Sequence, residues 1–414
     1  MVNKVLVLIV VGIMFAFGVA AAAEGAVHGD GQSDVLISSG DRVVFLGDSI
    51  TEQMIYNRYV INYFTLRYPG MKLSFRNAGW GGDTAVGGLN RLKRDVLSLK
   101  PTVVTICYGM NDGGYKKLSE GAMKNYQTGM SGLVSELKKA GVKVVLLTPG
   151  CVDPDRNPDL KGYNDTLEAL GKYVQDLART ENVPFFDLHS LMMDVQNRAK
   201  KADPSFTMIP DGVHPSQPGH AIMAYALLKA LGCRGRISSL VIDAAAGKSS
   251  SEGCVVSKLE ISDDRITFIR RDDTLPAYFD PEAQGIFSFV PITDELNRYM
   301  LRVTGLRHGQ WKLDVDGIEV GNFSSDDLAR GVNLALMQGP WRRLGEEVNR
   351  MSAEQAGLYF NRWRNIGLMN LPKEAEPERK ALLAKLDKAL DDMDAERVGA
   401  VSKRDWVWTL AVIK

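Results

Sequence analysis

The stretch Arg42-Val-Val-Phe-Leu-Gly47, followed at once by Asp48-Ser-Ile-Thr51, decides the fold class. It is a short apolar run that stops at a glycine, which is typical of a strand buried on both faces of a sheet. Later runs of the same kind, rich in Val, Ile or Phe, lie at Leu73–Asn77, Thr102–Tyr108, Val142–Thr148 and Val183–Leu188. The sequence therefore predicts a sheet built from these buried strands.

Longer amphipathic stretches separate and follow these runs. They are Glu52–Tyr68, Ala85–Leu99, Ser119–Ala140, Asp159–Thr180, Leu191–Lys201 and Pro218–Leu231. Strands and helices in alternation indicate an α/β fold, with a parallel sheet and helices on both faces. Ligands of such sheets bind beyond the carboxyl ends of the strands, so the residues that follow each strand form the candidate site.

The first two strand ends carry residues suited to acyl chemistry. Ser49 lies at the expected start of a helix, where free N–H groups favour a developing negative charge. After the second strand, the glycines of Asn77-Ala-Gly-Trp-Gly-Gly-Asp-Thr84 let the backbone approach a ligand, and the N–H of Gly82 can donate to it. Plainer interpretations remain open, since serine is a common helix N-cap and a glycine-rich loop can simply turn the chain.

Two further blocks lie after the third strand and before the last helix. Gly109-Met-Asn-Asp112 offers the Asn111 amide, either as a hydrogen-bond donor or as a turn residue. The spacing of Asp211-Gly-Val-His214 lets one loop hold a carboxylate against an imidazole, whose other nitrogen can then take a proton from a hydroxyl. A histidine taken alone is more often structural, but His214 lies close to an acid in a chain with only 5 histidines.

The blocks in this order resemble the SGNH hydrolases, also called the GDSL esterase/lipase family. The resemblance covers about Arg42–Leu231, where Ser49, Gly82, Asn111 and His214 match the family's Ser, Gly, Asn and His. It implies a flavodoxin-like three-layer α/β/α sandwich around a five-stranded parallel sheet, in agreement with the pattern of strands and helices.

The resemblance also implies a role for each matched residue. Ser49 is expected to attack an ester carbonyl while His214 accepts its proton and Asp211 orients the imidazole. The backbone N–H groups of Ser49 and Gly82 and the side chain of Asn111 are expected to form the oxyanion hole. Water then releases the acyl group from the serine. No metal or organic cofactor is implied.

The character of the sequence changes after Gly235. Strands are expected at Cys254–Ile261, Arg265–Arg270, Tyr299–Val303, Trp311–Val315, Ile318–Val320 and Asp405–Ile413, and a charged helix near Glu374–Val398. Asp316-Gly317 predicts a tight hairpin, because its turn needs positive φ. We expect a catalytic domain at residues 34–235 and a C-terminal β-plus-helix accessory region at residues 236–414.

Aromatic residues are frequent in this accessory region. Its tryptophans could form an exposed sugar-binding platform, but burial in a core or interface is the commoner outcome. They are Trp311, Trp341, Trp363, Trp406 and Trp408. The string Leu358-Tyr-Phe-Asn-Arg-Trp-Arg-Asn365 fits a catalytic cleft or a docking surface, although interface packing is favoured.

The N-terminus has the pattern of a secretory signal peptide. Lys4 precedes an apolar segment, Val5–Val19, and the alanines at 20–23 offer a cleavage site. We expect residues 1–23 to be removed near Ala23 and the enzyme to be exported, periplasmic or extracellular, with membrane contact only through this segment. An uncleaved membrane anchor is the alternative, since the segment is nearly long enough to span a bilayer.

Composition narrows the class of protein further. The 414 residues carry 50 Lys+Arg and 50 Asp+Glu, and without a long basic run this balance argues against nucleic-acid binding. Cys107 and Cys151 are expected to be buried thiols, whereas Cys233 and Cys254 either pair or stay free. No Cys/His spacing suggests a zinc site.

The walls of the predicted site favour a small acyl group. The loops carry Trp80, Tyr108, Tyr115 and Tyr163 rather than a continuous aliphatic lining, and a long acyl chain would need an apolar groove. We therefore expect O-acetyl groups on carbohydrate, a small-molecule or polysaccharide ester, with Trp80 and Tyr108 as candidate substrate-binding residues. A lipid-acting lipase or lysophospholipase, an acyltransferase and a non-catalytic glycan-binding protein are the alternatives.

Overall fold

The computed structural model describes residues 35–413 of the chain. The expected strands form one five-stranded parallel sheet in the order β2-β1-β3-β4-β5. They are β1 (Arg42–Gly47), β2 (Ser74–Gly79), β3 (Val103–Cys107), β4 (Lys143–Leu147) and β5 (Phe185–Phe186). The strand order reverses between β1 and β3, and this switch point is where parallel sheets open a crevice for ligands at the carboxyl ends of the strands.

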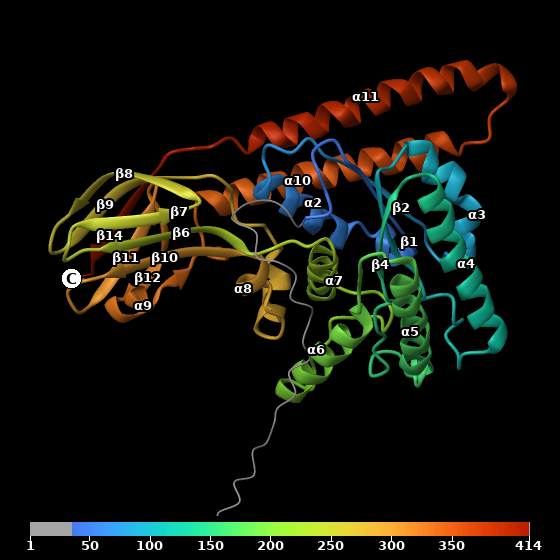
Figure 1. Cartoon of the computed structure of the whole chain (residues 1–414), viewed down its shortest axis with the longest axis horizontal. Coiled ribbons are helices and arrows are strands. Elements are labelled where there is room, and N and C mark those ends of the chain that lie inside the picture. Colours follow the sequence, from blue (N-terminus) through green and yellow to red (C-terminus); the bar gives the residue numbers. More distant parts are fainter. Residues whose placement is uncertain (1–34, 414) are drawn as a thin grey trace, which may run out of the picture. The chain divides into compact units, whose positions relative to one another are not determined.

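Helices cover both faces of the sheet and make the predicted α/β/α sandwich (Figure 1). They are α1 (Ser49–Glu52), α2 (Ile55–Arg67), α3 (Ala85–Asp95), α4 (Glu120–Lys139), α5 (Tyr163–Glu181), α6 (Leu188–Ala202) and α7 (Gln217–Ala230). Val43 and Phe45 pack in one core with residues of α2, α6 and α7, while Val44 and Leu46 pack in another with residues of α3, α4 and α5. Successive side chains of β1 point to opposite faces of the sheet, so the strand contributes to both cores.

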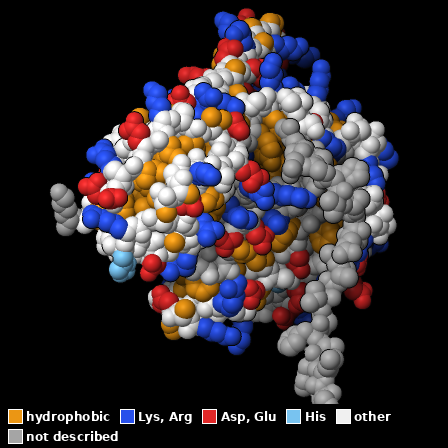
Figure 2. All heavy atoms as spheres, turned by 60° about the vertical axis from the view of Figure 1, so that its left-hand side comes forward, with side chains coloured by type: hydrophobic (Ala, Val, Ile, Leu, Met, Phe, Trp, Pro, Cys, Tyr) orange, Lys and Arg blue, Asp and Glu red, His pale blue; other side chains and the backbone are white. Residues whose placement is uncertain are grey.

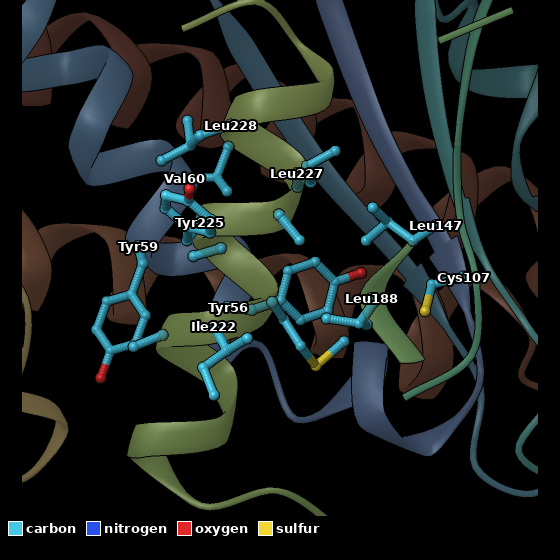
Figure 3. Close-up of a cluster of buried hydrophobic side chains, with 14 of the residues drawn as sticks. Tyr56, Tyr59, Val60, Cys107, Leu147, Leu188, Ile222, Tyr225, Leu227 and Leu228 are labelled. Atoms are coloured by element: carbon cyan, nitrogen blue, oxygen red, sulfur yellow. The ribbon is translucent and has the colours of Figure 1, made fainter. Parts of the chain in front are cut away.

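Helix α7 is buried on all sides, which explains why its sequence is apolar all round. It contacts both α2 and β4, so every residue from Gly219 to Leu228 is buried. Figure 3 shows this core, with Tyr56 and Val60 of α2 and Leu147 of β4 around the side chains of α7. Burying side chains of this size contributes roughly 1.5–3 kcal/mol each, which anchors the segment that follows His214.

The C-terminal region contains two further sheets, ordered β13-β10-β6-β7 and β12-β11-β14-β9-β8. Their strands are β6 (Arg236–Asp243), β7 (Lys248–Glu252), β8 (Cys254–Ile261), β9 (Arg265–Asp272), β10 (Arg298–Thr304), β11 (Gln310–Val315), β12 (Ile318–Ser324), β13 (Val332–Asn333) and β14 (Trp406–Val412). The predicted hairpin joins β11 and β12, with φ values of 49° at Asp316 and 74° at Gly317.

Helices of the C-terminal region pack against the parallel-sheet half. α10 (Pro340–Phe360) contacts α2 and β2, continues as the π-helical segment η4 (Asn361–Gly367), and lies beside α11 (Glu376–Ala400) (Figure 1). The shorter helices of this region are α8 (Ile292–Leu296), α9 (Ser325–Arg330) and the 3₁₀ turns η3 (Pro281–Ser288) and η5 (Lys373–Ala375). Two further 3₁₀ turns, η1 (Leu97–Leu99) and η2 (Pro158–Leu160), belong to the parallel-sheet half.

Some elements differ from the sequence-based expectation. β6 and β7 were not expected, and β7 is fully exposed and polar, so no apolar alternation marks it. β5 has only two residues, which pair with Leu146 and Leu147 of β4, so it is shorter than the strand expected at Val183–Leu188. The single helix expected over residues 52–68 is divided at Met54, whose φ of 60° separates the turn α1 from α2.

The tryptophans of the accessory region and the four cysteines of the chain are buried. All five tryptophans are at most 5% exposed, so a platform of exposed rings is excluded. Trp406 and Trp408 lie on the buried face of β14, as the alternating pattern predicts. Cys233 and Cys254 are both buried and unpaired, like Cys107 and Cys151.

The chain from Val35 onward groups as one compact unit, and the boundary expected at residue 235 stays a prediction. The expected signal peptide lies outside the described residues. On the face shown in Figure 2, Lys and Arg side chains are interspersed with Asp and Glu. None of the helices between residues 35 and 413 has the length and apolar character needed to cross a membrane.

Candidate active site

Ser49 is the first residue of the short helix α1 and is separated from β1 only by Asp48. The chain can turn there because Gly47 has no side chain: a Cβ at this position would lie 2.2 Å from Oγ1 of Thr51. Asp48, not Ser49, caps the helix, since its Oδ1 accepts the N–H of Ile50 over 3.0 Å. The serine hydroxyl is therefore free of the capping role that the sequence left open.

Asp211 and His214 lie together on the loop before α7, as their spacing predicts. Oδ1 of Asp211 accepts the backbone N–H groups of Val213 and His214 over 2.8 and 2.7 Å, which shapes the loop. Its Oδ2 lies 2.7 Å from Nδ1 of His214. On the other side of the ring, Nε2 lies 2.9 Å from Oγ of Ser49. One carboxylate, one imidazole and one hydroxyl thus form a continuous hydrogen-bonded series.

The charge of Asp211 suits this arrangement. Partial burial acts to raise the pKa of its carboxyl, but hydrogen bonds from the backbone and ring of His214 and from the N–H of Val213 outweigh burial. The pKa of Asp211 therefore lies below its ordinary value. An ionised carboxylate accepts the proton on Nδ1, which leaves Nε2 as the nitrogen that can take a proton from Ser49.

Gly82 lies in a tight turn beyond β2. Asp83 donates its N–H to the carbonyl of Trp80 over 3.0 Å, and Gly82 has the positive φ of 73° that the third position of a type II turn requires. A Cβ at Gly82 would meet nothing within 4 Å, so glycine is needed here for backbone conformation rather than for space.

Asn111, beyond β3, is fixed at both ends of its amide. Its Nδ2 donates to the carbonyl of Asp83 over 2.8 Å, and its Oδ1 accepts the hydroxyl of Tyr115 over 2.8 Å. The Asn111 amide is therefore tied to the turn that carries Gly82. The sequence predicts Tyr115 only as a wall residue, because a loop sequence does not show which atom a hydroxyl contacts.

Tyr108 supports the site from inside and does not line it. The side chain is only 1% exposed, and its hydroxyl donates to Oδ2 of Asp83 over 2.7 Å and accepts from Arg91 over 2.8 Å. The burial of Tyr108 does not support the expectation that it binds substrate, because the residue follows β3 and turns its side chain into the core. Arg91 also pairs with Asp83 over 2.8 Å, so the turn is held from below.

Trp80 packs against the C-terminal region. The guanidinium carbon of Arg364 lies 3.4 Å from the centroid of its ring, and Trp363 meets the same ring edge-on at 5.8 Å. A contact between Trp80 and substrate stays a prediction, since Arg364 covers one face of the ring. Sequence reasoning favoured packing for the string around Trp363 but did not connect it with this loop.

Buried carboxyl groups surround the turn. Burial, followed by the nearby carboxylates of Asp112 and Asp83, raises the pKa of Asp48 to about 7. Burial also raises the pKa of Asp112 to about 6, although its Oδ1 accepts the N–H of Ala85. Among the described residues, no group of three or more His, Cys, Asp and Glu side chains is arranged to hold a metal ion.

The geometry provides what acyl transfer through a serine needs. The hydroxyl of Ser49 is within proton-transfer distance of His214, and the Asn111 amide is hydrogen-bonded to the turn that carries Gly82. The sequence-predicted catalytic residues are thus brought together by strand ends β1, β2 and β3 and by the loop before α7.

Comparisons with known proteins identify chains that are similar to this one. Residues 45–222 match the model of the GDSL-like lipase/acylhydrolase family. An acetylxylan esterase from Geobacillus stearothermophilus is 27% identical over 217 residues, which are 47% of this chain and 96% of that protein. A crystal structure of that esterase, Axe2, covers the same shares with 27% identity and a TM-score of 0.40.

A second solved structure is similar over most of the chain. BT4096, described as a gut microbial diltiazem-metabolizing enzyme, has 25% sequence identity and a TM-score of 0.78, and the match covers 91% of this chain and 98% of that one. The parallel-sheet half and the C-terminal sheets and helices therefore recur together in another protein.

Proposed function

We propose that this chain, which belongs to the SGNH hydrolase family and is a serine carboxylic ester hydrolase, acts on O-acetyl esters of carbohydrate. The observation that carries the catalytic part is the hydrogen-bonded series Asp211–His214–Ser49, with distances of 2.7 and 2.9 Å. It lies at the switch point of the sheet, where ligands of this fold class bind.

In the first half-reaction, Oγ of Ser49 attacks the ester carbonyl carbon while Nε2 of His214 removes the hydroxyl proton. Asp211 keeps the proton of the ring on Nδ1 and stabilises the imidazolium. The tetrahedral intermediate then breaks its bond to the alcohol oxygen, and His214 returns the proton to that leaving group. The products are a free alcohol and an acyl group on Ser49.

The negative charge of the intermediate needs donors that are already in place. We assign this role to the backbone N–H groups of Ser49 and Gly82 and to Nδ2 of Asn111, since Asn111 is tied to the Gly82 turn through Asp83. One such donor is typically worth about 3 kcal/mol of barrier. Water, activated by the same His214, then hydrolyses the acyl-serine and regenerates the free hydroxyl.

The acetyl-carbohydrate assignment rests on two supports. The related protein from Geobacillus stearothermophilus is named as an acetylxylan esterase. The wall residue Tyr115 is aromatic and hydrogen-bonded to Asn111 rather than part of an aliphatic groove, whereas Tyr163 is buried like Tyr108 and does not line the site. The long acyl chain of a lipid would need such a groove, because each buried methylene contributes only about 0.8 kcal/mol.

A panel of esters tests the proposal. Acetylated xylo-oligosaccharides, diltiazem and 4-nitrophenyl esters of increasing acyl length are to be compared on wild type and Ser49→Ala. We expect release of acetate from the oligosaccharides, a kcat/KM that falls steeply with acyl length, and loss of turnover in Ser49→Ala. A preference for long chains would replace the substrate assignment by a lipid ester, and undiminished activity of Ser49→Ala would remove the catalytic assignment.

Export is a separate part of the proposal. The apolar segment before the alanines at 20–23 supports cleavage near Ala23 and action outside the cytoplasm. Sequencing the N-terminus of the protein recovered from its native compartment tests this. A new N-terminus close to Glu24 is the expected result, and an intact Met1 on membrane-bound protein would favour the uncleaved anchor.

A further inference from the structure

The segment η4 of the C-terminal region reaches the loops that carry the proposed catalytic groups. η4 continues α10 with π-helical hydrogen bonding. This geometry is rare in proteins overall, and where it occurs it is often at a functional site. Trp363 anchors it: the ring is 5% exposed, stacks on Tyr359 and donates its Nε1–H to Asp95 over 3.3 Å. The next residue, Arg364, is thereby directed at the parallel-sheet half.

Arg364 makes two contacts at once. Its guanidinium carbon lies 3.4 Å from the ring centroid of Trp80, which is a stacked arrangement, and its Nη1 donates to Oε1 of Glu52 over 2.9 Å. The side chains of Arg364 and Glu52 are 19% and 26% exposed. A planar guanidinium can stack and hydrogen-bond simultaneously, which a lysine ammonium cannot do.

The two partners of Arg364 belong to the two segments that the proposed mechanism must hold in register. Glu52 ends α1, the single helical turn that begins at Ser49. Trp80 is the first residue of the turn that contains Gly82, and its carbonyl accepts the N–H that closes this turn. The carboxylate of Glu52 also lies against the turn, because a Cβ on Gly81 would come within 2.9 Å of Oε2.

The opposite end of the turn is held by residues of the parallel-sheet half. Arg91 and Tyr108 bind the carboxylate of Asp83 over 2.8 and 2.7 Å. Arg91 also lies near the Trp80 ring, but at 5.7 Å from the centroid, well beyond the stacking distance of Arg364. At the Trp80 end, the backbone N–H donates to the carbonyl of Gly47 over 3.1 Å, and the side chain is held by Arg364, which lies 312 positions from Glu52 in the sequence.

We propose that Arg364 is a positioning residue for the esterase reaction. By holding Trp80 and Glu52 together, it fixes the separation between the N–H of Gly82 and the hydroxyl of Ser49. The C-terminal region would then complete the catalytic site of the other half of the chain. This inference rests on the roles proposed for Ser49 and Gly82 and adds to them the residue that sets their relative position.

The direct test compares Arg364→Met with Arg362→Met in the full chain. Arg362 lies on the same π-helical segment, but it pairs with Asp387 over 2.8 and 2.7 Å, and within the described residues no hydrogen bond, ion pair or ring contact joins it to Trp80 or Glu52. We expect kcat on an acetyl ester to fall roughly 10- to 100-fold in Arg364→Met with KM within about twofold, because small misplacement of reacting groups costs rate rather than binding. Arg362→Met should keep the wild-type kcat.

A transition-state analogue separates positioning from general damage. A trifluoromethyl ketone that adds to the serine needs the oxyanion donors, so its affinity should fall in Arg364→Met by the same factor as kcat. A melting temperature matching that of Arg362→Met confirms that the variant is folded. A raised KM with unchanged kcat would overturn the proposal, since Arg364 would then contact substrate. Equal losses in both variants would overturn it as well.

Conservative variants keep the test decisive if Arg364→Met does not fold. Arg364→Lys retains the charge beside Glu52 but not the stacked plane, and Glu52→Gln retains an acceptor without the charge. Each should lose part of kcat, and wild-type kcat in both would refute the inference. Failure of the proposed function itself is recognised separately, because it would appear as undiminished turnover in Ser49→Ala.

Discussion

The hydroxyl of Tyr115 donates a hydrogen bond of 2.8 Å to Oδ1 of Asn111. Because this oxygen is occupied by a donor, the amide nitrogen of Asn111 faces Asp83, whose carbonyl it binds over 2.8 Å. An amide nitrogen carries two protons, so it can donate to a second acceptor as well. Burial raises the pKa of Tyr115 to about 12, so this hydroxyl stays a donor throughout the neutral range.

Replacing Tyr115 by Phe should lower kcat while leaving KM nearly unchanged. Without the hydroxyl, the Asn111 amide loses the contact that fixes its orientation, and a donor that points correctly only part of the time stabilises the oxyanion less. Since deleting a whole donor costs about 100-fold or more, we expect a loss of roughly tenfold. Steady-state kinetics on an acetyl ester measure it.

Tyr173→Phe is the matched control for this experiment. Its hydroxyl donates to the carbonyl of Gln127 over 3.3 Å on an exposed surface between helices. The same deletion there should leave kcat unchanged. Wild-type kcat in Tyr115→Phe would mean that Asn111 is held by Asp83 alone.

The residues proposed as catalytic could be picked out from the sequence because each lies at the end of a strand or on one short loop. Apolar runs such as Arg42–Gly47 locate the strand ends, and a parallel sheet brings those ends to one edge. The Asp211–His214 contact spans three positions, so loop spacing alone indicates it. Such local patterns are sufficient for these residues.

Other features depend on packing between distant segments and leave no local pattern. The contact between Arg364 and Glu52 spans 312 positions and arises because α10 lies on α2 and β2. Tyr108 follows a strand, like the proposed site residues, and only the direction of its side chain places it in the core. The polar strand β7 is exposed along its length, so hydrophobic alternation does not mark it.

Gly82→Ala should reduce kcat strongly with a modest loss of stability. The φ of 73° is unfavourable for alanine by about 1–2 kcal/mol, and relaxation of the turn would tilt the N–H away from the oxyanion. Gly141→Ala is the control, because Gly141 has a φ of 74° and equally open space around its Cα. Both variants should lose similar stability in thermal denaturation, but only Gly82→Ala should lose activity. Equal kcat values would remove Gly82 from the oxyanion hole.

Asp211→Asn should lower kcat by about 10³- to 10⁴-fold, because an amide favours the wrong tautomer of His214. The sign of the pH effect follows from the depressed pKa of Asp211: its hydrogen bonds are present above the ordinary value of 3.8 and are lost only as pH falls through the lower value in the folded protein. The advantage of wild type over the variant should therefore persist from about pH 5 to pH 8.

The control for this comparison is Asp176→Asn. Asp176 is exposed on α5 and pairs with Arg179 over 2.9 Å. It should retain wild-type kcat over the same pH range. A wild-type to Asp211→Asn ratio that collapses near neutral pH would show that the carboxyl is protonated there, contrary to the environment described for it.

Asp48→Asn should stabilise the protein at alkaline pH. Burial raises the pKa of Asp48 from 3.8 to about 7, so the folded state favours the protonated carboxyl. The stability that this group contributes is complete below about pH 4 and is lost as pH rises through 7, when a charge must be buried. Asparagine has no proton to lose, and it can still accept the N–H of Ile50 as a helix cap.

The melting temperatures of wild type and Asp48→Asn are therefore to be compared at pH 4 and pH 8. Even a free-energy gain of about 1 kcal/mol raises the melting temperature of a protein this large by roughly 2 °C. We expect the variant to melt higher at pH 8 and the difference to shrink or reverse at pH 4. Asp326→Asn, on the exposed side of α9, should show no such change between the two pH values. The contrary outcome is a variant that melts below wild type by the same amount at pH 8 and at pH 4. It would mean that ionisation of the buried Asp48 carboxyl does not destabilise the fold.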